Sequence, residues 1–225
     1  MTLQYRTIDA GNEKWEGPRQ LGVLLHGFGA NADDLAGLVP VLDPRHRLTW
    51  ILPEAPVSLE PLGLPGGRAW FPESPTEIID ALTGSYFSQL SQLDPPAIQA
   101  SARSVRALVQ SVLDAMHGSL TVLAGFSQGG MVAAESVLSG LMQPDRLMLF
   151  SSALVARDRW TKLAESELPQ YALFQSHGLQ DPILTHRSGQ DLYDLLAPRS
   201  AKREWHSFEG GHTIPESVCL AAARF

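Results

Sequence analysis

The sequence predicts an α/β protein, with a mostly parallel sheet and helices on both of its faces. Short apolar runs of strand length alternate along the chain with segments whose apolar residues recur at helical spacing. Such alternation is typical of right-handed strand–helix–strand units, which build parallel sheets. α/β proteins of about this length, 225 residues, usually form one domain. We therefore expect a single domain over residues 1–225.

The first part of the chain predicts three strands and one helix. The strands are Leu3–Asp9, Gln20–Leu25 and Leu48–Leu52. The second and third are nearly all apolar, as strands buried on both faces are. Turn-forming residues over Gly11–Arg19 connect the first two strands. Asn31 and Asp33 are candidate N-caps of a helix over Asp34–Leu42.

From Pro53 to Pro96 the periodicity is lost. Prolines and glycines recur there between large apolar residues such as Leu64, Trp70 and Phe71. A loop this long inside a compact domain is typically functional or disordered, and the apolar content argues against disorder. We interpret residues 53–96 as an excursion near the upper edge of the sheet that forms a lid or an acyl groove. The alternative is an apolar loop packed on the core.

The remainder of the chain alternates regularly. Pro96–Met116 has apolar residues at helical spacing and predicts a long amphipathic helix. The strands expected after it are Thr121–Ala124, Arg146–Phe150, Tyr171–Gln175 and Lys202–Phe208. The helices expected between and after these strands are Gln128–Leu141, Asp158–Ala164, Leu184–Leu196 and Ser217–Arg224.

Charge and composition restrict the possible partners. The net charge is -7, and no basic run is present to release counterions from nucleic acid or anionic lipid. The N-terminus has no basic segment followed by an apolar core, and no apolar stretch approaches membrane-spanning length. We therefore expect a cytoplasmic protein without nucleic-acid partners or stable membrane insertion. Cys219, the only cysteine, lies between apolar residues and is expected to be a packed thiol.

The segment Gly125-Phe-Ser-Gln-Gly129 lies where a buried strand is expected to turn into a helix. In that context the G-x-S-x-G pattern predicts a strained elbow that lifts the hydroxyl of Ser127 to the top of a parallel sheet. A serine hydroxyl is a poor nucleophile at neutral pH. It needs a base within hydrogen-bond reach and a third group that orients the base.

Two segments downstream of Ser127 supply candidates for the base and the acid. Proteins with this elbow place the acid and then a histidine after the serine. Asp181 follows one expected strand and His212 follows the next, so both should lie at the carboxyl edge of the sheet. Asp181 is the best acid and His212 the best base. The weaker alternatives are Glu209 as the orienting carboxylate, His177 as a support for the turn at Asp181, and His186 and His206 as solvated or core-packed imidazoles.

Attack on a carbonyl creates an oxyanion, which preorganised N–H donors stabilise. One donor should be the backbone N–H of Gln128, directly after the nucleophile. The other should be the backbone N–H of Phe28, where Gly27 and Gly29 let the chain approach a substrate. His26 is then expected to orient this loop. A zinc site built from His177, Asp181, His186 and His212 is a rival interpretation, which would leave the serine elbow unexplained.

Six segments together resemble the phospholipase/carboxylesterase family, which includes the acyl-protein thioesterases. They are Leu25–Leu35, Ala55-Pro56, Gly67–Phe71, Gly125–Gly130, His177–Asp181 and Gly211–Pro215. The resemblance implies an α/β-hydrolase fold without a separate cap domain, no cofactor or metal, and a triad of Ser127, Asp181 and His212. It also implies that Trp70 and Phe71 lie by the mouth of the site, and Leu64 is a further candidate for substrate contact.

Two positions depart from the family pattern. Pro72 stands where the family commonly has an acidic residue after the Trp-Phe pair, and Ser151-Ser152 stands where it commonly has Ser-Gly. Both lie near the expected acyl pocket, so substrate size is the property that transfers least.

The sequence thus predicts a serine hydrolase that cleaves carboxylic esters, and possibly acyl thioesters, through an acyl-serine intermediate. Its substrate would be a small or lipid-like ester, or an acylated protein. One alternative within hydrolases is a long-chain acyl-protein thioesterase or lysophospholipase. An alternative from another class is a non-catalytic ligand-binding protein that keeps the hydrolase scaffold. The oligomeric state is left open.

Overall fold

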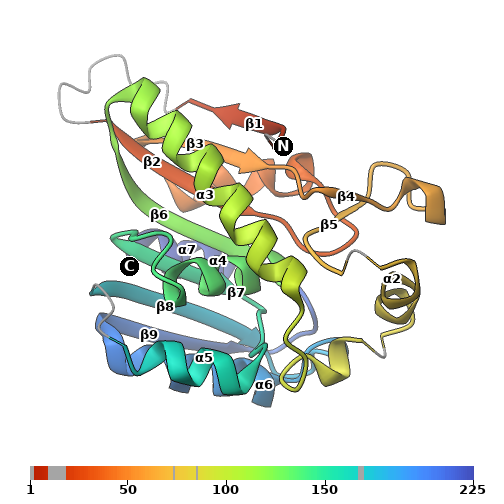
Figure 1. The fold of residues 1–225 in the computed structure, drawn as a ribbon. Coiled ribbons are helices and arrows are strands. Elements are labelled where there is room, and N and C mark those ends of the chain that lie inside the picture. The colour runs from red at the N-terminus through yellow and green to blue at the C-terminus, as the bar shows by residue number, and fades with distance from the viewer. Residues whose placement is uncertain (1–2, 10–18, 73, 85, 167–169) are drawn as a thin grey trace.

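A seven-stranded sheet with the order β1-β3-β2-β6-β7-β8-β9 runs through the molecule (Figure 1). The computed structural model describes residues 3–9, 19–72, 74–84, 86–166 and 170–225. The strands are β1 (Tyr5–Ile8), β2 (Gln20–Leu25), β3 (Leu48–Pro53), β6 (Ser119–Phe126), β7 (Arg146–Phe150), β8 (Tyr171–Gly178) and β9 (Ser200–Phe208). Only β1 runs antiparallel to its neighbour, and all other neighbours pair in parallel. The predicted mostly parallel sheet is confirmed.

Helices cover both faces of the sheet, as predicted. The helices α3 (Pro96–Met116), α4 (Gln128–Leu138), α5 (Arg157–Ala164) and α6 (His186–Leu196) contribute buried side chains to the core of one face. The opposite face is covered by the 3-10 helix η1 (Ala32–Leu38), α1 (Val39–Leu42) and α7 (Glu216–Arg224). The sheet is therefore buried between two apolar layers, which explains why its central strands carry so few polar residues.

The helix expected over Asp34–Leu42 is present but differs in kind. Asn31 caps it, with its side chain accepting from the N–H of Asp33, and Asp34 completes a capping box. Residues 32–38 form the 3-10 helix η1. Only α1, residues 39–42 with Pro40 among them, is α-helical. Proline has no N–H to donate, so it cannot continue an α-helical hydrogen-bond ladder from the preceding turn. Asp33 lies in the first turn and is not the cap.

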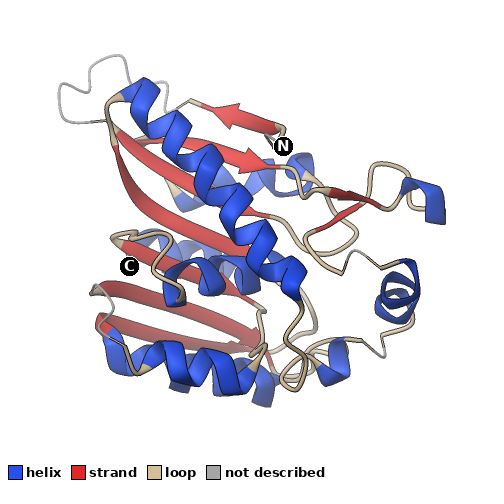
Figure 2. Cartoon of the chain, in the orientation of Figure 1, coloured by secondary structure: helices blue, strands red, loops and turns tan. Residues whose placement is uncertain are grey.

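The excursion over residues 53–96 contains short elements that its sequence pattern did not reveal. They are β4 (Val57–Ser58), η2 (Glu60–Leu62), β5 (Arg68–Ala69), α2 (Pro75–Leu82) and η3 (Phe87–Gln89), and β4 pairs with β5. Leu59, Trp70 and Phe71 are fully buried, as an apolar loop packed on the core would be, whereas α2 exposes Ile79 and Leu82. The excursion lies on the side of the molecule where the parallel strands end (Figure 2). A role as lid or acyl groove stays a prediction.

Apart from Arg19, the connection expected over Gly11–Arg19 lies outside the described residues. Cys219 is buried in α7, and burial raises the pKa of its thiol, so it is a packed thiol as expected. Within the described ranges, no helix combines the length and the apolar character needed to cross a bilayer.

Candidate active site

Ser127 lies in a sharp turn between β6 and α4. Its backbone has φ 53° and ψ −119°, a conformation that is costly for a residue with a side chain. Gly125 and Gly129 make the turn possible. A Cβ atom on Gly125 would lie 2.4 Å from the carbonyl carbon of Gly129, and one on Gly129 would lie 2.3 Å from the carbonyl oxygen of Leu25. Both glycines of the G-x-S-x-G pattern are therefore required by backbone contacts.

Replacing Gly129 by alanine should destabilise the protein strongly. The new methyl group would have to displace the main chain of β2, so we expect a loss of about 3 kcal/mol or more in the free energy of unfolding. Equilibrium urea denaturation measures this loss. Gly37→Ala is the matched control, because nothing lies within 4 Å of a Cβ at Gly37. The steric explanation is wrong if Gly129→Ala unfolds at the same urea concentration as the wild type.

The three residues predicted as a triad are joined by two hydrogen bonds through His212. His212 Nε2 is 2.8 Å from Ser127 Oγ, and His212 Nδ1 is 2.7 Å from Asp181 Oδ2. An ionised carboxylate only accepts hydrogen bonds, so Nδ1 of His212 carries the proton and Nε2 is free to accept from the serine hydroxyl. The arrangement can accept the proton of Ser127 when the oxygen attacks a carbonyl carbon.

Asp181 is held in place from several directions. Its Oδ1 accepts from the N–H groups of Ile183 and Leu184, each at 2.9 Å, and its side chain is fully buried. Burial alone would raise its pKa, but hydrogen bonds from His177, His212 and the N–H of Leu184 outweigh burial and hold the pKa of Asp181 well below its usual range. The group is therefore a carboxylate at every pH at which the enzyme would work.

His177 supports the turn at Asp181. Its Nε2–H is shared between two acceptors, the carbonyl of Leu184 at 2.8 Å and Asp181 Oδ2 at 3.3 Å. The imidazole is completely buried, and Gly189 leaves room for it, because a Cβ there would lie 2.3 Å from His177 Nδ1. These contacts fit the supporting role considered from the sequence.

The other candidate residues have partners away from Ser127. Glu209 accepts from the side chain of Gln180, His186 is hydrogen-bonded to Ser207, and His206 contacts Glu204 and stacks on Phe174. In the part of the chain that the structure describes, no group of three or more His, Cys, Asp or Glu side chains is arranged to hold a metal ion.

The loop after β2 carries Phe28 and is fastened to the excursion. Gly29 donates to the carbonyl of Arg68 at 2.8 Å, and the N–H of Arg68 donates to the carbonyl of Ala30 at 3.0 Å. The ring of Phe28 packs edge-on against Phe87. The N–H of Gln128 opens α4, where the first N–H groups have no acceptor within the helix. The oxyanion roles of the Phe28 and Gln128 N–H groups stay predictions.

His26 is placed to orient that loop. Its Nδ1 donates to the carbonyl of Gly27 at 2.8 Å, and its Nε2 accepts from the N–H of Ala55 at 3.1 Å. Burial lowers the pKa of His26 to about 4, so the imidazole is neutral at physiological pH. Protonation of Nε2 would remove the acceptor of Ala55. The neutral ring therefore connects the end of β2 to the segment after β3.

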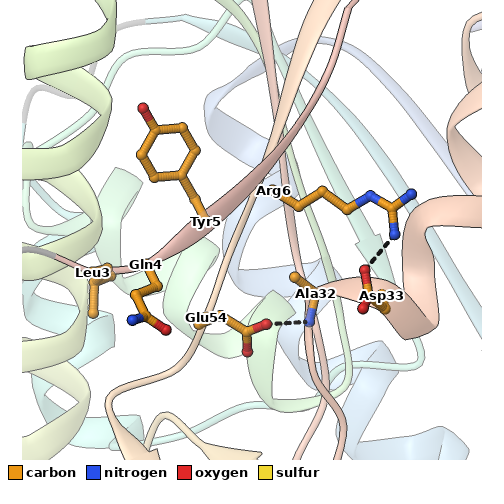
Figure 3. A pocket seen from close by; sticks show the side chains of 7 residues that line it. All are labelled: Leu3, Gln4, Tyr5, Arg6, Ala32, Asp33 and Glu54. Atoms are coloured by element: carbon orange, nitrogen blue, oxygen red, sulfur yellow. Dashed lines mark hydrogen bonds and ion pairs between the residues drawn. The ribbon is translucent and has the colours of Figure 1, made fainter.

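Glu54 fastens the far side of the same loop. Its Oε1 accepts from the N–H of Ala32 at 3.2 Å, and Oε2 lies 3.7 Å from Arg68 Nε. Glu54 lines an open pocket of about 470 Å³ together with Arg6 and Asp33, which form an ion pair (Figure 3). None of the triad residues lines that pocket.

Trp70 and Phe71, predicted to contact substrate, have no exposed surface. Gln128 holds them: its Oε1 accepts from the N–H of Trp70 at 2.8 Å, and its Nε2 donates to the carbonyl of Phe71. The indole N–H of Trp70 donates to the carbonyl of His26, and the hydroxyl of Ser101 donates to the carbonyl of Trp70. The pair thus ties the excursion to β2, α3 and α4, and direct contact with substrate would require this segment to shift.

Leu64, the third residue predicted to contact substrate, is half-buried. It packs with Phe28 against the small apolar cluster of Leu59, Ala69 and Ile78. Its role toward substrate stays a prediction.

Ser151 and Ser152 contribute to the site in a way that the sequence analysis missed. The hydroxyl of Ser152 donates to the carbonyl of Ser127 at 3.0 Å, and the hydroxyl of Ser151 donates to the carbonyl of Thr213 at 3.0 Å. The first bond supports the elbow and the second supports the loop of His212. The departure from the family's Ser-Gly pattern at these positions was the feature of the sequence that could have indicated these roles.

The chain is similar to known hydrolases over most of its length. Residues 8–225 match the family described as phospholipase/carboxylesterase. A protein named acyl-protein thioesterase 1 from Cryptococcus neoformans is 26% identical over 185 residues, covering 79% of this chain and 72% of the relative. A protein of the same name from Mycosarcoma maydis is 26% identical over 217 residues, covering 87% of this chain and 83% of the relative.

Among solved structures, esterase PE8 aligns with a TM-score of 0.78 at 23% identity, covering 100% of this chain and 98% of that one. The Bacillus cereus carboxylesterase aligns with a TM-score of 0.73 at 18% identity, covering 99% and 92%. At such identities the alignments establish the fold, which is that of the α/β-hydrolases. Because the family match spans nearly the whole chain, the protein belongs to the phospholipase/carboxylesterase family of hydrolases.

Proposed function

We propose that this ester hydrolase works through an acyl-enzyme formed on Ser127. The observation that carries the proposal is the unbroken series of hydrogen bonds from Asp181 through His212 to Ser127 Oγ. Such a series is the arrangement in which a neutral imidazole removes the proton of a serine hydroxyl. Asp181, buried and ionised, would fix the tautomer of His212 and stabilise the imidazolium.

The reaction would proceed in two halves. Ser127 Oγ attacks the carbonyl carbon while His212 Nε2 takes the hydroxyl proton. Collapse of the tetrahedral intermediate breaks the ester bond, and His212 returns the proton to the departing alcohol or thiol. Water then attacks the acyl-serine with His212 again as base, which releases a carboxylic acid and restores Ser127. These steps use side chains, backbone N–H groups and water alone.

The oxyanion formed in both halves would lie between the N–H groups of Phe28 and Gln128. The N–H of Gly29 and the carbonyl of Ala30 are both hydrogen-bonded to the main chain of Arg68, so that loop is preorganised before substrate arrives. Preorganised donors act without reorganisation in the transition state, and one such donor is typically worth about 3 kcal/mol of barrier.

Exposed apolar side chains favour a substrate with a medium or longer acyl chain. Leu62, Ile79 and Leu82 of the excursion and Leu179 and Ile183 of the loop that carries Asp181 are at least 39% exposed. Large apolar groups exposed on the segments around a site are typical of surfaces that meet an apolar ligand. Two fungal relatives are named acyl-protein thioesterase 1, so a long-chain acyl thioester on a protein is the second candidate substrate.

A series of nitrophenyl esters of increasing acyl length tests this preference. We expect kcat/KM to rise from acetate to octanoate, because each methylene buried in an apolar groove contributes about 0.8 kcal/mol, or about fourfold. Ile79→Ser should weaken the rise while leaving acetate hydrolysis unchanged, and Leu220→Ser, a comparably exposed apolar residue on α7, serves as control. A kcat/KM that falls beyond acetate would indicate a small acyl pocket.

A fluorophosphonate probe tests the nucleophile directly. Mass spectrometry of the treated protein should find one covalent adduct, on the peptide that contains Ser127. An intact protein without an adduct would favour the alternative of a non-catalytic binder on a hydrolase scaffold.

We infer from the sequence a cytoplasmic location and a substrate that is a small or lipid-like ester or an acylated protein.

A further inference from the structure

A second cavity lies at the opposite edge of the sheet from Ser127. It measures about 620 Å³ and is lined by residues at the starts of β2, β3, β6 and β7, by residues 42–45 and 47, and by the end of α7. Figure 1 labels these strands and α7. Ser127 follows the carboxyl end of β6, whereas this cavity lies at the amino ends of the same parallel strands. We call it the arginine pocket, after Arg45, Arg47, Arg146 and Arg224 in its lining.

The indole of Trp50 forms part of the lining of the arginine pocket. In the sheet, Gly22 of β2 lies between Trp50 of β3 and Val122 of β6. A Cβ atom on Gly22 would lie 2.6 Å from Trp50 Cδ2, so the indole lies flat over this glycine. Trp50 is 1% exposed, yet its Nε1 has no hydrogen-bond partner among the described residues. The indole N–H is a donor that lacks an acceptor.

Thr121 adds a second buried group without a partner. The register between β2 and β6 shifts after Leu21, which pairs with Leu120, while Gly22 pairs with Val122. Thr121 is therefore the bulged residue of β6, and it lines the same cavity. Its Oγ1 is buried and has no hydrogen-bond partner in the described part of the chain. Buried polar groups are nearly always paired, so two unpaired groups on residues that line one cavity point to a missing acceptor.

The charge of the lining fits the same conclusion. It holds four arginines and one acidic side chain, Asp43, whose two oxygens already accept from the N–H groups of Arg47 and Leu48. Within the described ranges, none of the four guanidiniums lies within 4.0 Å of a carboxylate oxygen. This cluster occurs in a chain with a net charge of -7, so it does not reflect a basic protein.

Arg146 is the member of the cluster that lies on a strand of the sheet, β7. It pairs with Val122 in the sheet and is half-buried. Burial lowers the pKa of its guanidinium, an effect opposed by Asp145 and Asp43 and increased by Arg47. An unpaired, partly desolvated cation gains from an anion placed beside it.

We propose that the arginine pocket binds a small organic anion, namely a carboxylate or phosphate group attached to an apolar body. The arginines and the indole N–H are donors only, and the threonine hydroxyl can donate as well, so the complementary group is an oxyanion. Leu42, Met148 and Leu220 supply apolar lining for the rest of the ligand. The volume lies in the range of small-molecule sites. The proposal is independent of the chemistry at Ser127.

Nuclear magnetic resonance of the indole N–H of Trp50 tests the proposal with phenyl phosphate as the probe. The signal is assigned in the ¹⁵N-labelled protein by its loss in Trp50→Phe. We expect it to move saturably on titration. Arg146→Met should weaken binding about 10- to 100-fold and Thr121→Val about 3- to 10-fold, whereas Arg187→Met, an exposed arginine paired with Asp191, should not change it.

Two further ligands and one assay complete the test. Benzoate and phenyl phosphate identify which oxyanion is preferred, and inorganic phosphate should bind at least tenfold more weakly than phenyl phosphate. Ester hydrolysis by Arg146→Met should stay within about twofold of the wild type. The proposal is overturned if phenyl phosphate leaves the Trp50 signal unmoved, if folded Thr121→Val and Arg146→Met bind as the wild type does, or if inorganic phosphate binds equally well.

Discussion

Ser127→Ala is expected to lower kcat/KM for ester hydrolysis by about 10⁴-fold or more. Removal of the oxygen removes the atom that would become acylated, so no acyl-enzyme can form. The remaining turnover would come from the oxyanion donors and from water activated by His212, which in comparable triads leave a small residual rate above the uncatalysed reaction. Steady-state hydrolysis of nitrophenyl butyrate measures the loss.

The protein should stay folded in this variant. The elbow is held through main-chain groups: the N–H of Ser127 donates to the carbonyl of Phe150, and its carbonyl accepts from Ser152. Neither bond uses the hydroxyl that the substitution removes. Ser104→Ala is a suitable control, because Ser104 lies in α3 and donates to the carbonyl of Ala100. Turnover of Ser127→Ala within tenfold of the wild type would show that another group is the nucleophile.

The sheet could be predicted from the sequence because its strands are nearly all apolar. The bounds expected for β2, β7 and α3 are those of the structure. β6 and β8 extend two or three residues past their apolar runs, since their main chains continue to pair with β7 and β9. Pairing of that kind depends on a neighbouring strand, so it leaves no mark in the local pattern.

The meeting of the three proposed triad residues could be predicted because parallel strands bring their carboxyl ends to one edge. Ser127, Asp181 and His212 follow three different strands, and the order of the strands alone places them together. The hydrogen bonds from the Gln128 side chain to the main chain of Trp70 and Phe71 could not be predicted in this way. They join residues about 57 positions apart and depend on side-chain geometry. The burial of Trp70 follows from the same contacts, which an isolated Trp-Phe pair does not indicate.

Asp181→Asn is expected to lower kcat by about 10⁴-fold while the protein stays folded. The carboxylate accepts from the N–H groups of Ile183 and Leu184 with one oxygen and faces His212 Nδ1 with the other. An amide has only one oxygen. If that oxygen keeps the bonds to the main chain, its NH₂ group faces His212 and favours the tautomer with the proton on Nε2. An Nε2 that carries a proton cannot accept the one from Ser127.

This result separates an orienting role from a merely structural one. A structural loss would lower the fraction of active enzyme and leave the rate of each active molecule unchanged, whereas the wrong tautomer lowers the rate of every molecule. Titration of active sites with a fluorophosphonate therefore distinguishes the two, because slow but complete labelling is expected only for the tautomer defect. Glu209→Gln is the control, since that carboxylate accepts from Gln180 rather than from a histidine. Equal losses in the two variants would contradict the assignment of Asp181.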